Sequence, residues 1–203
     1  MQDCGDSSSR TAVRSARRFF LMSALAAGLA GCAALLPQSP NAIFDLTAPG
    51  EGTAAGGGPQ VLVPTPTAVA ALDTIRIAAR PSPSEYAYLP DSQWSDTLPK
   101  LLQARLIETL ENSGRVRAAG LPGQRLLIDY QIVLDIRAFE LQGAGAVVEF
   151  GVKLMDDRTG RVIRARSVRH VVPVASADNA VVVVALDAAM DRAFLEIIGW
   201  AFR

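Results

Sequence analysis

Residues 126–139, with the sequence LLIDYQIVLDIRAF, carry the strictest alternation of apolar and polar side chains in the chain. Successive side chains of a β-strand point to opposite faces, so a period of two predicts a strand with one buried face. The polar positions are Asp129, Gln131, Asp135 and Arg137, and the apolar ones are Leu126, Ile128, Tyr130, Ile132, Leu134 and Ile136. We therefore expect a long strand with one dry face here.

Two more strands are predicted to follow. A turn at residues 142–145 (QGAG) leads into a second alternation, whose apolar members are Ala146, Val148, Phe150, Val152 and Leu154. A second turn is expected at residues 156–160 (DDRTG), where Gly160 suits the positive φ that tight turns require. A third strand over 162–172 alternates less clearly. Residues 126–172 are thus predicted to form a long antiparallel meander with one dry face and one polar face.

A helix is predicted before the meander, from about residue 96 to 112. Its leucines recur every three or four residues and make one apolar stripe, at Leu98, Leu101, Leu102, Leu106 and Leu110. Ser95 is a candidate N-cap, and Pro99 falls in the first turn, where a missing N–H is tolerated. Gly114 is a suitable C-terminal stop.

A second helix is predicted after the meander, from about residue 178 to 200, with Ser176 and Asp178 as candidate caps. It opens on four consecutive valines, which have poor helix propensity, so packing must hold it. Its apolar stripe is broad enough to contact the sheet and a second partner. The stripe consists of Val182, Leu186, Ala189, Ala193 and Ile197, broadened by Met190, Phe194, Ile198 and Trp200. We assign both helices to one core.

Shorter elements are predicted elsewhere in residues 42–203. The expected strands are 43–46, 61–63, 72–78, 86–89 and 115–118. Pro64 and Pro66 would confine the second of these to a sheet edge, and Pro81 would end the third. Residues 47–60, rich in Gly, Ala and Pro, are predicted to be a flexible loop. Residues 42–203 are then one α+β domain, an antiparallel sheet packed by two main helices.

The N-terminus has the features of an export signal. Residues 10–18 (RTAVRSARR) hold four arginines and no acid, and residues 19–30 (FFLMSALAAGLA) are an apolar run of 12 residues. At 1.5 Å per residue that run is too short for a hydrocarbon core of roughly 30 Å, so we expect residues 1–31 to be a signal peptide. Arg17-Arg18 partly resembles a twin-arginine signal, so the choice between general and twin-arginine export stays open.

Leu29-Ala30-Gly31-Cys32 resembles the lipobox of bacterial lipoproteins. The resemblance implies cleavage before Cys32 and acylation of this residue by more than one chain, which is enough for stable membrane attachment. Residues 32–41 would then be a lipidated tether. Position 33 is Ala and not Asp, which by the enterobacterial sorting rule implies the outer membrane.

Composition and motifs argue against catalysis and nucleic-acid binding. Residues 1–31 hold four of the 20 basic and two of the 20 acidic side chains, so the rest has a formal charge of −2 and no basic footprint. No nucleophile elbow, phosphate-binding loop, dinucleotide fingerprint or zinc motif occurs. His170 is the only histidine and is expected to be structural, and the pairs Asp129/Asp135 and Asp156/Asp157 are expected to be solvated. We predict no enzyme, no cofactor and no metal.

The chain resembles the ABC-type transport auxiliary lipoprotein component family over roughly residues 42–202. The residues that carry the resemblance are Phe44-Asp45-Leu46, Ile75-Arg76-Ile77-Ala78-Ala79-Arg80, Tyr86-Ala87-Tyr88 and Gln93-Trp94-Ser95-Asp96-Thr97-Leu98-Pro99. The Tyr/Trp cluster before the first helix is the most family-like segment. We therefore single out Tyr86, Tyr88 and Trp94 as candidate partner-binding residues, with a core role for Trp94 as the alternative.

The resemblance implies a periplasm-facing accessory of a lipid-transporting ABC system at the outer membrane. The implied partners are proteins with mammalian-cell-entry (MCE) domains, a permease and an ATPase, which this chain would dock. The alternative is a structural envelope lipoprotein, such as a secretin pilot or an outer-membrane assembly factor. Whether the domain itself binds lipid or forms a homo-oligomer stays open, as do the transported lipid and the direction of transport.

Overall fold

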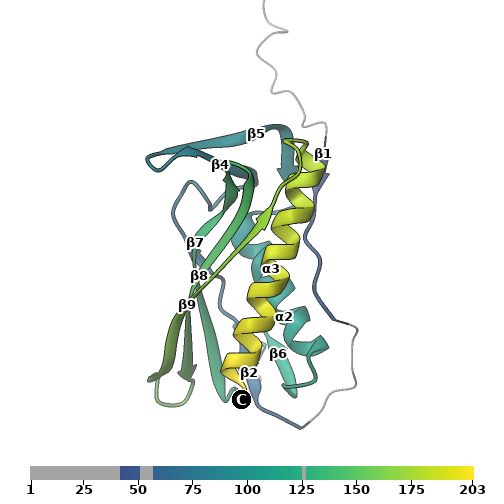
Figure 1. The fold of residues 1–203 in the computed structure, drawn as a ribbon. Helices are drawn as coiled ribbons and strands as arrows, with labels where there is room; N and C mark the ends of the chain where they lie inside the picture. The colour runs from purple at the N-terminus through teal and green to yellow at the C-terminus, as the bar shows by residue number, and fades with distance from the viewer. Residues whose placement is uncertain (1–41, 51–56, 125–126) are drawn as a thin grey trace, which may run out of the picture. The chain divides into compact units, whose positions relative to one another are not determined.

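The computed structural model describes residues 42–50, 57–124 and 127–203 (Figure 1). The predicted signal peptide, Cys32 and the tether lie outside the described residues. The strands are β1 (Ala42–Phe44), β2 (Gln60–Leu62), β3 (Thr67–Ala68), β4 (Arg76–Ser82), β5 (Glu85–Trp94), β6 (Ala118–Gly120), β7 (Tyr130–Gln142), β8 (Gly145–Asp156) and β9 (Val162–Pro173). The helices are α2 (Leu98–Asn112) and α3 (Asn179–Ala201). In this part of the chain no helix is both long and apolar enough to cross a membrane.

The antiparallel meander is confirmed, but its first strand begins at Tyr130 and not at residue 126, which lies outside the described residues. β7 pairs with β8 from Tyr130↔Asp156 to Gln142↔Gly145, and β8 pairs with β9 from Gly145↔Pro173 to Met155↔Val162. Both turns use glycine in the left-handed region, with φ of +56° at Gly143 and +68° at Gly160. The apolar positions predicted for the second strand are all buried.

The sheet as a whole is mixed, which corrects the prediction of an antiparallel sheet. On its other edge β7 pairs in parallel with β2, β3 and β4, and the pairs β1–β5 and β2–β6 are parallel too. Parallel neighbours arise through long crossover connections, here residues 45–84 for the pair β1–β5 and segments that include α2 for the other pairs. Alternation along a strand reports which face is buried, but it carries no information on the direction of the neighbouring strand.

A β-bulge divides β7 and reverses its alternation. The pairing shifts between Ile136 and Ala138, so Arg137 is the extra residue on the bulged strand. Before the bulge, even-numbered residues such as Ile136 face the core. After it Phe139 is buried in the core, and the neighbouring Glu140 faces the opposite way.

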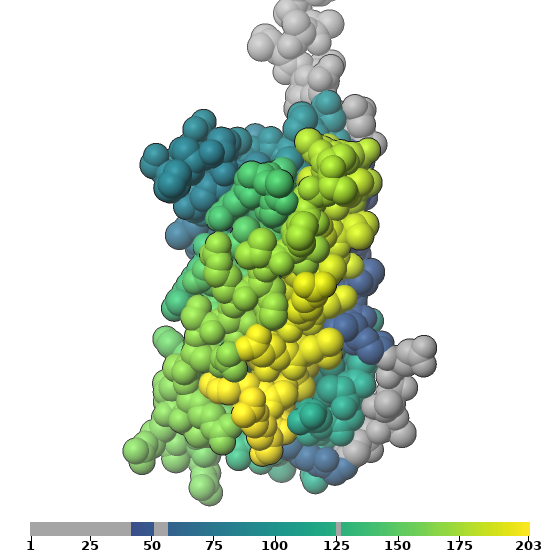
Figure 2. All heavy atoms as spheres, in the orientation of Figure 1, coloured from purple at the N-terminus to yellow at the C-terminus, as the bar shows by residue number. Residues whose placement is uncertain are grey.

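Both helices pack on the same side of the sheet, as the two stripes predicted. The stacked rings of Phe150 in β8 and Phe194 in α3 are 5.7 Å apart, and all five predicted stripe residues of α3 are buried in one cluster with those of α2. Asp178 caps α3 by accepting a hydrogen bond from the Ala180 amide at 2.9 Å. Figure 2 shows α3, in yellow, beside β9, in yellow-green, across one face of the domain.

Several element boundaries differ from the sequence predictions. The N-cap of α2 is Thr97 and not Ser95. β2 is not an edge strand, because it lies between β7 and β6 and the two prolines come only after it ends. β4, the strand predicted over residues 72–78, lies four residues later than predicted and contains Pro81. The missing N–H of Pro81 falls where the β4–β5 register shifts. β5 is ten residues long where a brief extended segment was expected.

The start of the predicted flexible loop is attached to both helices. Thr47 donates its amide and its hydroxyl to the carboxylate of Asp187 in α3, at 2.9 and 2.6 Å. The side-chain amide of Asn112 donates to the carbonyl of Gly50 at 3.2 Å. Residues 51–56 of the predicted loop lie outside the described residues.

Candidate functional site

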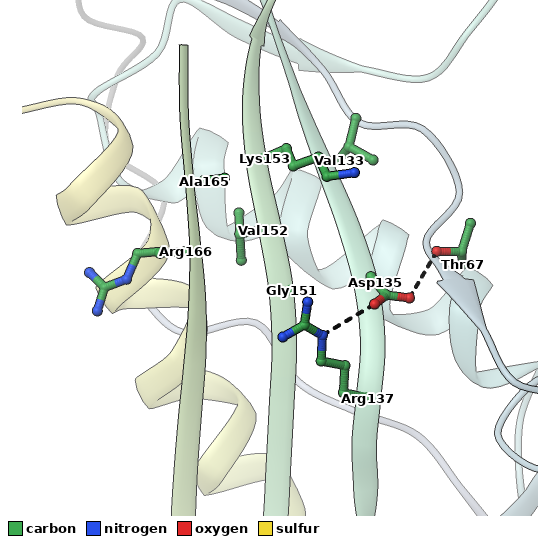
Figure 3. Close-up of a pocket in the computed structure, with 9 residues that line it drawn as sticks. All are labelled: Thr67, Val133, Asp135, Arg137, Gly151, Val152, Lys153, Ala165 and Arg166. Carbon is green, nitrogen blue, oxygen red and sulfur yellow. Dashed lines mark hydrogen bonds and ion pairs between the residues drawn. The ribbon is translucent and has the colours of Figure 1, made fainter. Parts of the chain in front are cut away.

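The outer face of the meander, opposite the helices, carries a groove of about 550 Å³ (Figure 3). The register aligns Asp135, Gly151 and Ser167 in one row across the sheet, and Val133, Lys153 and Ala165 in the next. Phe150, the neighbour of Gly151 on β8, points into the core. Because successive side chains point to opposite faces, these two rows face away from the core. Thr67 of β3 closes the groove on the side of β7.

Gly151 is the floor of this groove, and its lack of a side chain lets Arg137 lie flat on the sheet. A Cβ at position 151 would come within 2.7 Å of the Arg137 guanidinium. Arg137 donates to Asp135 Oδ2 at 3.2 Å and to Ser167 Oγ at 3.3 Å, and Thr67 donates to Asp135 Oδ1 at 3.2 Å. Lys153 adds a second, exposed cation. The groove therefore offers positive charge to an anionic group but no nucleophile with a base.

The predicted partner-binding tyrosines lie on β5, where arginines of β4 stack on them. The guanidinium carbon of Arg76 is 3.6 Å from the centre of the Tyr88 ring, and that of Arg80 is 4.3 Å from the Tyr86 ring. Tyr88 donates its hydroxyl to the Ala71 carbonyl at 3.3 Å. Both tyrosines are half-buried and pack against the core cluster.

Trp94 lies apart from this surface, in the core. Its side chain is 1% exposed and meets Phe139 edge-on, with ring centres 5.9 Å apart. In this packing the ring offers no surface to a partner, although it fixes the end of β5 that leads into α2. Partner contact through Trp94 itself stays a prediction.

Glu140 is a buried charged residue that no sequence motif indicates. Its side chain is 0% exposed, and its Oε1 lies 2.7 Å from Arg80 Nε and accepts a hydrogen bond from Gln142 Nε2 at 2.7 Å. Burial opposes the charge of Arg80, but the Tyr86 side chain and the Glu140 carboxylate outweigh it and raise the pKa of Arg80. The only signal in the sequence was the apolar surroundings of Glu140 within a strand.

The other acidic candidates, and the single histidine, have structural partners. Asp129 accepts a hydrogen bond from the Gln60 amide, and Asp157 accepts one from Gln131. Hydrogen bonds from Thr159, within the second turn, lower the pKa of Asp156. His170 Nε2 lies 2.8 Å from Glu196 of α3, which also pairs with Arg166. Among the described residues no three His, Cys, Asp or Glu side chains are grouped to hold a metal ion.

Asp191 on α3 carries an ionisable group in an unfavourable setting. Its Oδ1 is buried without a hydrogen-bond partner among the described residues. Burial, and then the charge of Asp187 one turn away, raise the pKa of Asp191 from 3.8 to about 6. Between these two values the folded protein binds more protons than the unfolded chain, so this group makes stability fall as the pH rises.

We expect Asp191→Asn to raise the free energy of unfolding at pH 7 by about 1 kcal/mol, well under the full value of the shift because the group is half-exposed. The gain should disappear as the pH is lowered below about 4, where Asp191 is protonated in both the folded protein and the unfolded chain. Urea unfolding across this pH range measures it. Asp73→Asn, in an exposed turn, controls for the loss of one negative charge, and an equal gain in that variant would contradict the explanation.

Comparison with known proteins identifies the family. The sequence model of the ABC-type transport auxiliary lipoprotein component family matches residues 44–198. The chain therefore belongs to this family, whose members are cell-envelope lipoproteins that act as auxiliary components of ABC-type transport.

Individual relatives agree with this placement. The uncharacterized protein bll6063 of Bradyrhizobium diazoefficiens is 36% identical over 140 residues, 68% of this chain, and the chain spans only 38% of that relative. The crystal structure of XCC0632 from Xanthomonas campestris superimposes with a TM-score of 0.72 at 27% identity, covering 79% of this chain and 94% of the other. A second crystal structure, of an uncharacterized protein, shares the fold with a TM-score of 0.63 at 15% identity, covering 78% of this chain and 96% of the other.

Proposed function

We propose that the chain is the periplasm-facing accessory of an ABC/MCE-type lipid transport system, held at the outer membrane by acyl chains on Cys32. In this role it docks the periplasm-spanning part of the machine and performs no catalysis. The observation that carries the proposal is the family match over residues 44–198, which associates the chain with an ABC-type transporter. The lipobox-like sequence at Cys32 supports the anchor.

The β4–β5 hairpin supports a docking role. It projects from one end of the sheet (Figure 1) and carries the two stacked arginine–tyrosine pairs. Tyr and Arg are enriched at protein interfaces because they combine apolar contact area with directed hydrogen bonds. We therefore assign the docking surface to Arg76, Arg80, Tyr86 and Tyr88.

Affinity capture of the full, lipidated chain from its own membranes tests the proposal. We expect recovery of an MCE-domain protein with a permease and an ATPase. Arg76→Glu should reduce that recovery, whereas Arg158→Glu, the same change in the exposed β8–β9 turn, should not. Recovery of secretin or outer-membrane assembly proteins without an MCE-domain protein would favour the alternative of a structural envelope lipoprotein.

The anchor has its own test within the same preparation. Cys32→Ala should leave the circular dichroism spectrum of the domain unchanged and move the protein from the membrane to the soluble fraction, because it removes every acyl chain. A Cys32→Ala protein that stays on the membrane after a high-salt wash would show that the anchor is elsewhere.

A further inference from the structure

A second groove, of about 470 Å³, runs between α2 and the edge strand β6. β6 pairs with β2 on one side and has no second strand neighbour in the described part of the chain. The walls are Ala104 and Ile107 of α2 on one side and Ala119 and Leu121 on the other. The volume lies within the range of ligand pockets, about 300–1,000 Å³.

The backbone of Ala119 points into this groove. The carbonyl of Gly120 accepts a hydrogen bond from the Val63 amide at 3.0 Å, so Gly120 faces β2. In a parallel pair the N–H and C=O of one residue point to the same neighbour, and those of the next residue point away from it. The amide and carbonyl of Ala119 therefore lie on the free edge, although the residue is only 8% exposed.

Two residues further on, the backbone amide and carbonyl of Leu121 have hydrogen-bond partners within the chain. Leu121 donates its amide to Gln124 Oε1 at 3.0 Å, and its carbonyl accepts from the Gln124 amide at 3.4 Å. Buried backbone groups normally find a partner, because an unpaired one costs about as much as a lost hydrogen bond. Within the described residues the free edge is thus capped at Leu121, and the backbone of Ala119 is left open toward the groove.

The helix wall of the groove is apolar in the middle and charged at its ends. Ala104 and Ile107 lie between Lys100 near the start of α2 and Glu111 near its end. Eleven residues of helix separate the two charges by roughly 16 Å along the axis, at 1.5 Å per residue. An extended chain covers that distance with about five residues, at roughly 3.3 Å each.

We propose that this groove binds an extended segment of a protein partner as an added strand on β6. The segment is about five residues long, pairs its backbone with Ala119 and packs the apolar side chain of its central residue on Ala104 and Ile107. Lys100 pairs with Asp96 at 3.4 Å, but its ammonium carries three N–H donors and can also bind an acidic residue of the segment; a basic residue of the segment lies near Glu111. An acyl chain could fill the same volume but would leave the polar groups of Ala119 unpaired. The proposal does not depend on which transporter the chain serves.

Two fluorescently labelled, capped peptides test the proposal on the full chain: Lys-Thr-Val-Thr-Glu and the reversed Glu-Thr-Val-Thr-Lys, in which the first, third and fifth side chains share the face that packs on α2. We expect one of them to bind with a Kd of about 1 mM or tighter, seen by fluorescence anisotropy. The same peptide should slow hydrogen exchange of the Ala119 amide. A matched peptide with proline at its centre, which lacks the central N–H, should bind about tenfold more weakly.

Variants separate the groove from non-specific binding. Ala104→Arg places a long side chain in the groove and should weaken peptide binding about tenfold, whereas Ala165→Arg, an exposed site on β9, should not. Thermal unfolding confirms that both variants fold. The proposal is overturned if neither peptide binds at millimolar concentration, if Ala119 exchange is unchanged, or if Ala104→Arg has no effect. Laurate binding that Ala104→Arg removes, in the absence of peptide binding, would identify the groove as an acyl-chain site.

Discussion

Arg80→Met is expected to lower the free energy of unfolding by about 3 kcal/mol, the low end of the range for buried ion pairs that lose one partner, because the Arg80 side chain is 25% exposed. The Glu140 carboxylate is fully buried, and Arg80 Nε lies 2.7 Å from it. Without Arg80, only the amide of Gln142 would still bond to that carboxylate, whose second oxygen has no hydrogen-bond partner among the described residues. Urea denaturation at pH 7 measures the loss.

The double variant Arg80→Met/Glu140→Leu should recover most of that stability, because a well-packed apolar pair can replace a buried ion pair at little cost. The control is Arg137→Met, which removes a half-exposed ion pair with Asp135 and should cost less than about 1 kcal/mol. If Arg80→Met lowered the free energy of unfolding no more than this control, the buried Glu140 carboxylate would not need Arg80 as its ion-pair partner. The β4–β5 hairpin would then have to be held by other contacts.

Trp94→Ala should cost about 3–5 kcal/mol, the range for removing a large aromatic side chain from a core. Trp94 is among the largest fully buried side chains, and its edge-on contact with Phe139 joins β5 to β7 just after the bulge. The cavity left behind would adjoin the start of α2. Thermal unfolding followed by circular dichroism, together with the urea midpoint, measures the loss.

Trp94→Phe separates the core role from a partner-binding role. It keeps an aromatic ring against Phe139, so it should recover a large part of the stability and leave transporter capture intact. The companion variant Tyr86→Ala changes a half-buried surface residue. It should reduce the recovery of the transporter and lower the free energy of unfolding less than Trp94→Ala does. A Trp94→Ala protein with unchanged stability but lost capture would instead place Trp94 at an interface.

The three partner-binding candidates lie in two different settings. Tyr86 and Tyr88 were singled out from family resemblance, and the structure adds the arginines stacked on them, which come from a neighbouring strand. Trp94 belongs to the same sequence cluster but lies in the core, because β5 is long enough to carry its end away from the hairpin. Glu140 was missed, since only the bulge at Arg137 turns its side chain away from the core.

The sequence by itself determined the three strands of the meander, the two helices and their common core. Each of these depends on a local period, two in strands and 3.6 in helices, which is present in the order of residues. Only the tertiary structure decided the parallel neighbours of β7, the buried Arg80–Glu140 pair, the groove floored by Gly151 and the open edge at Ala119. These features join residues far apart in the chain, and the period of a segment reports which of its faces is buried but not which distant segment lies beside it.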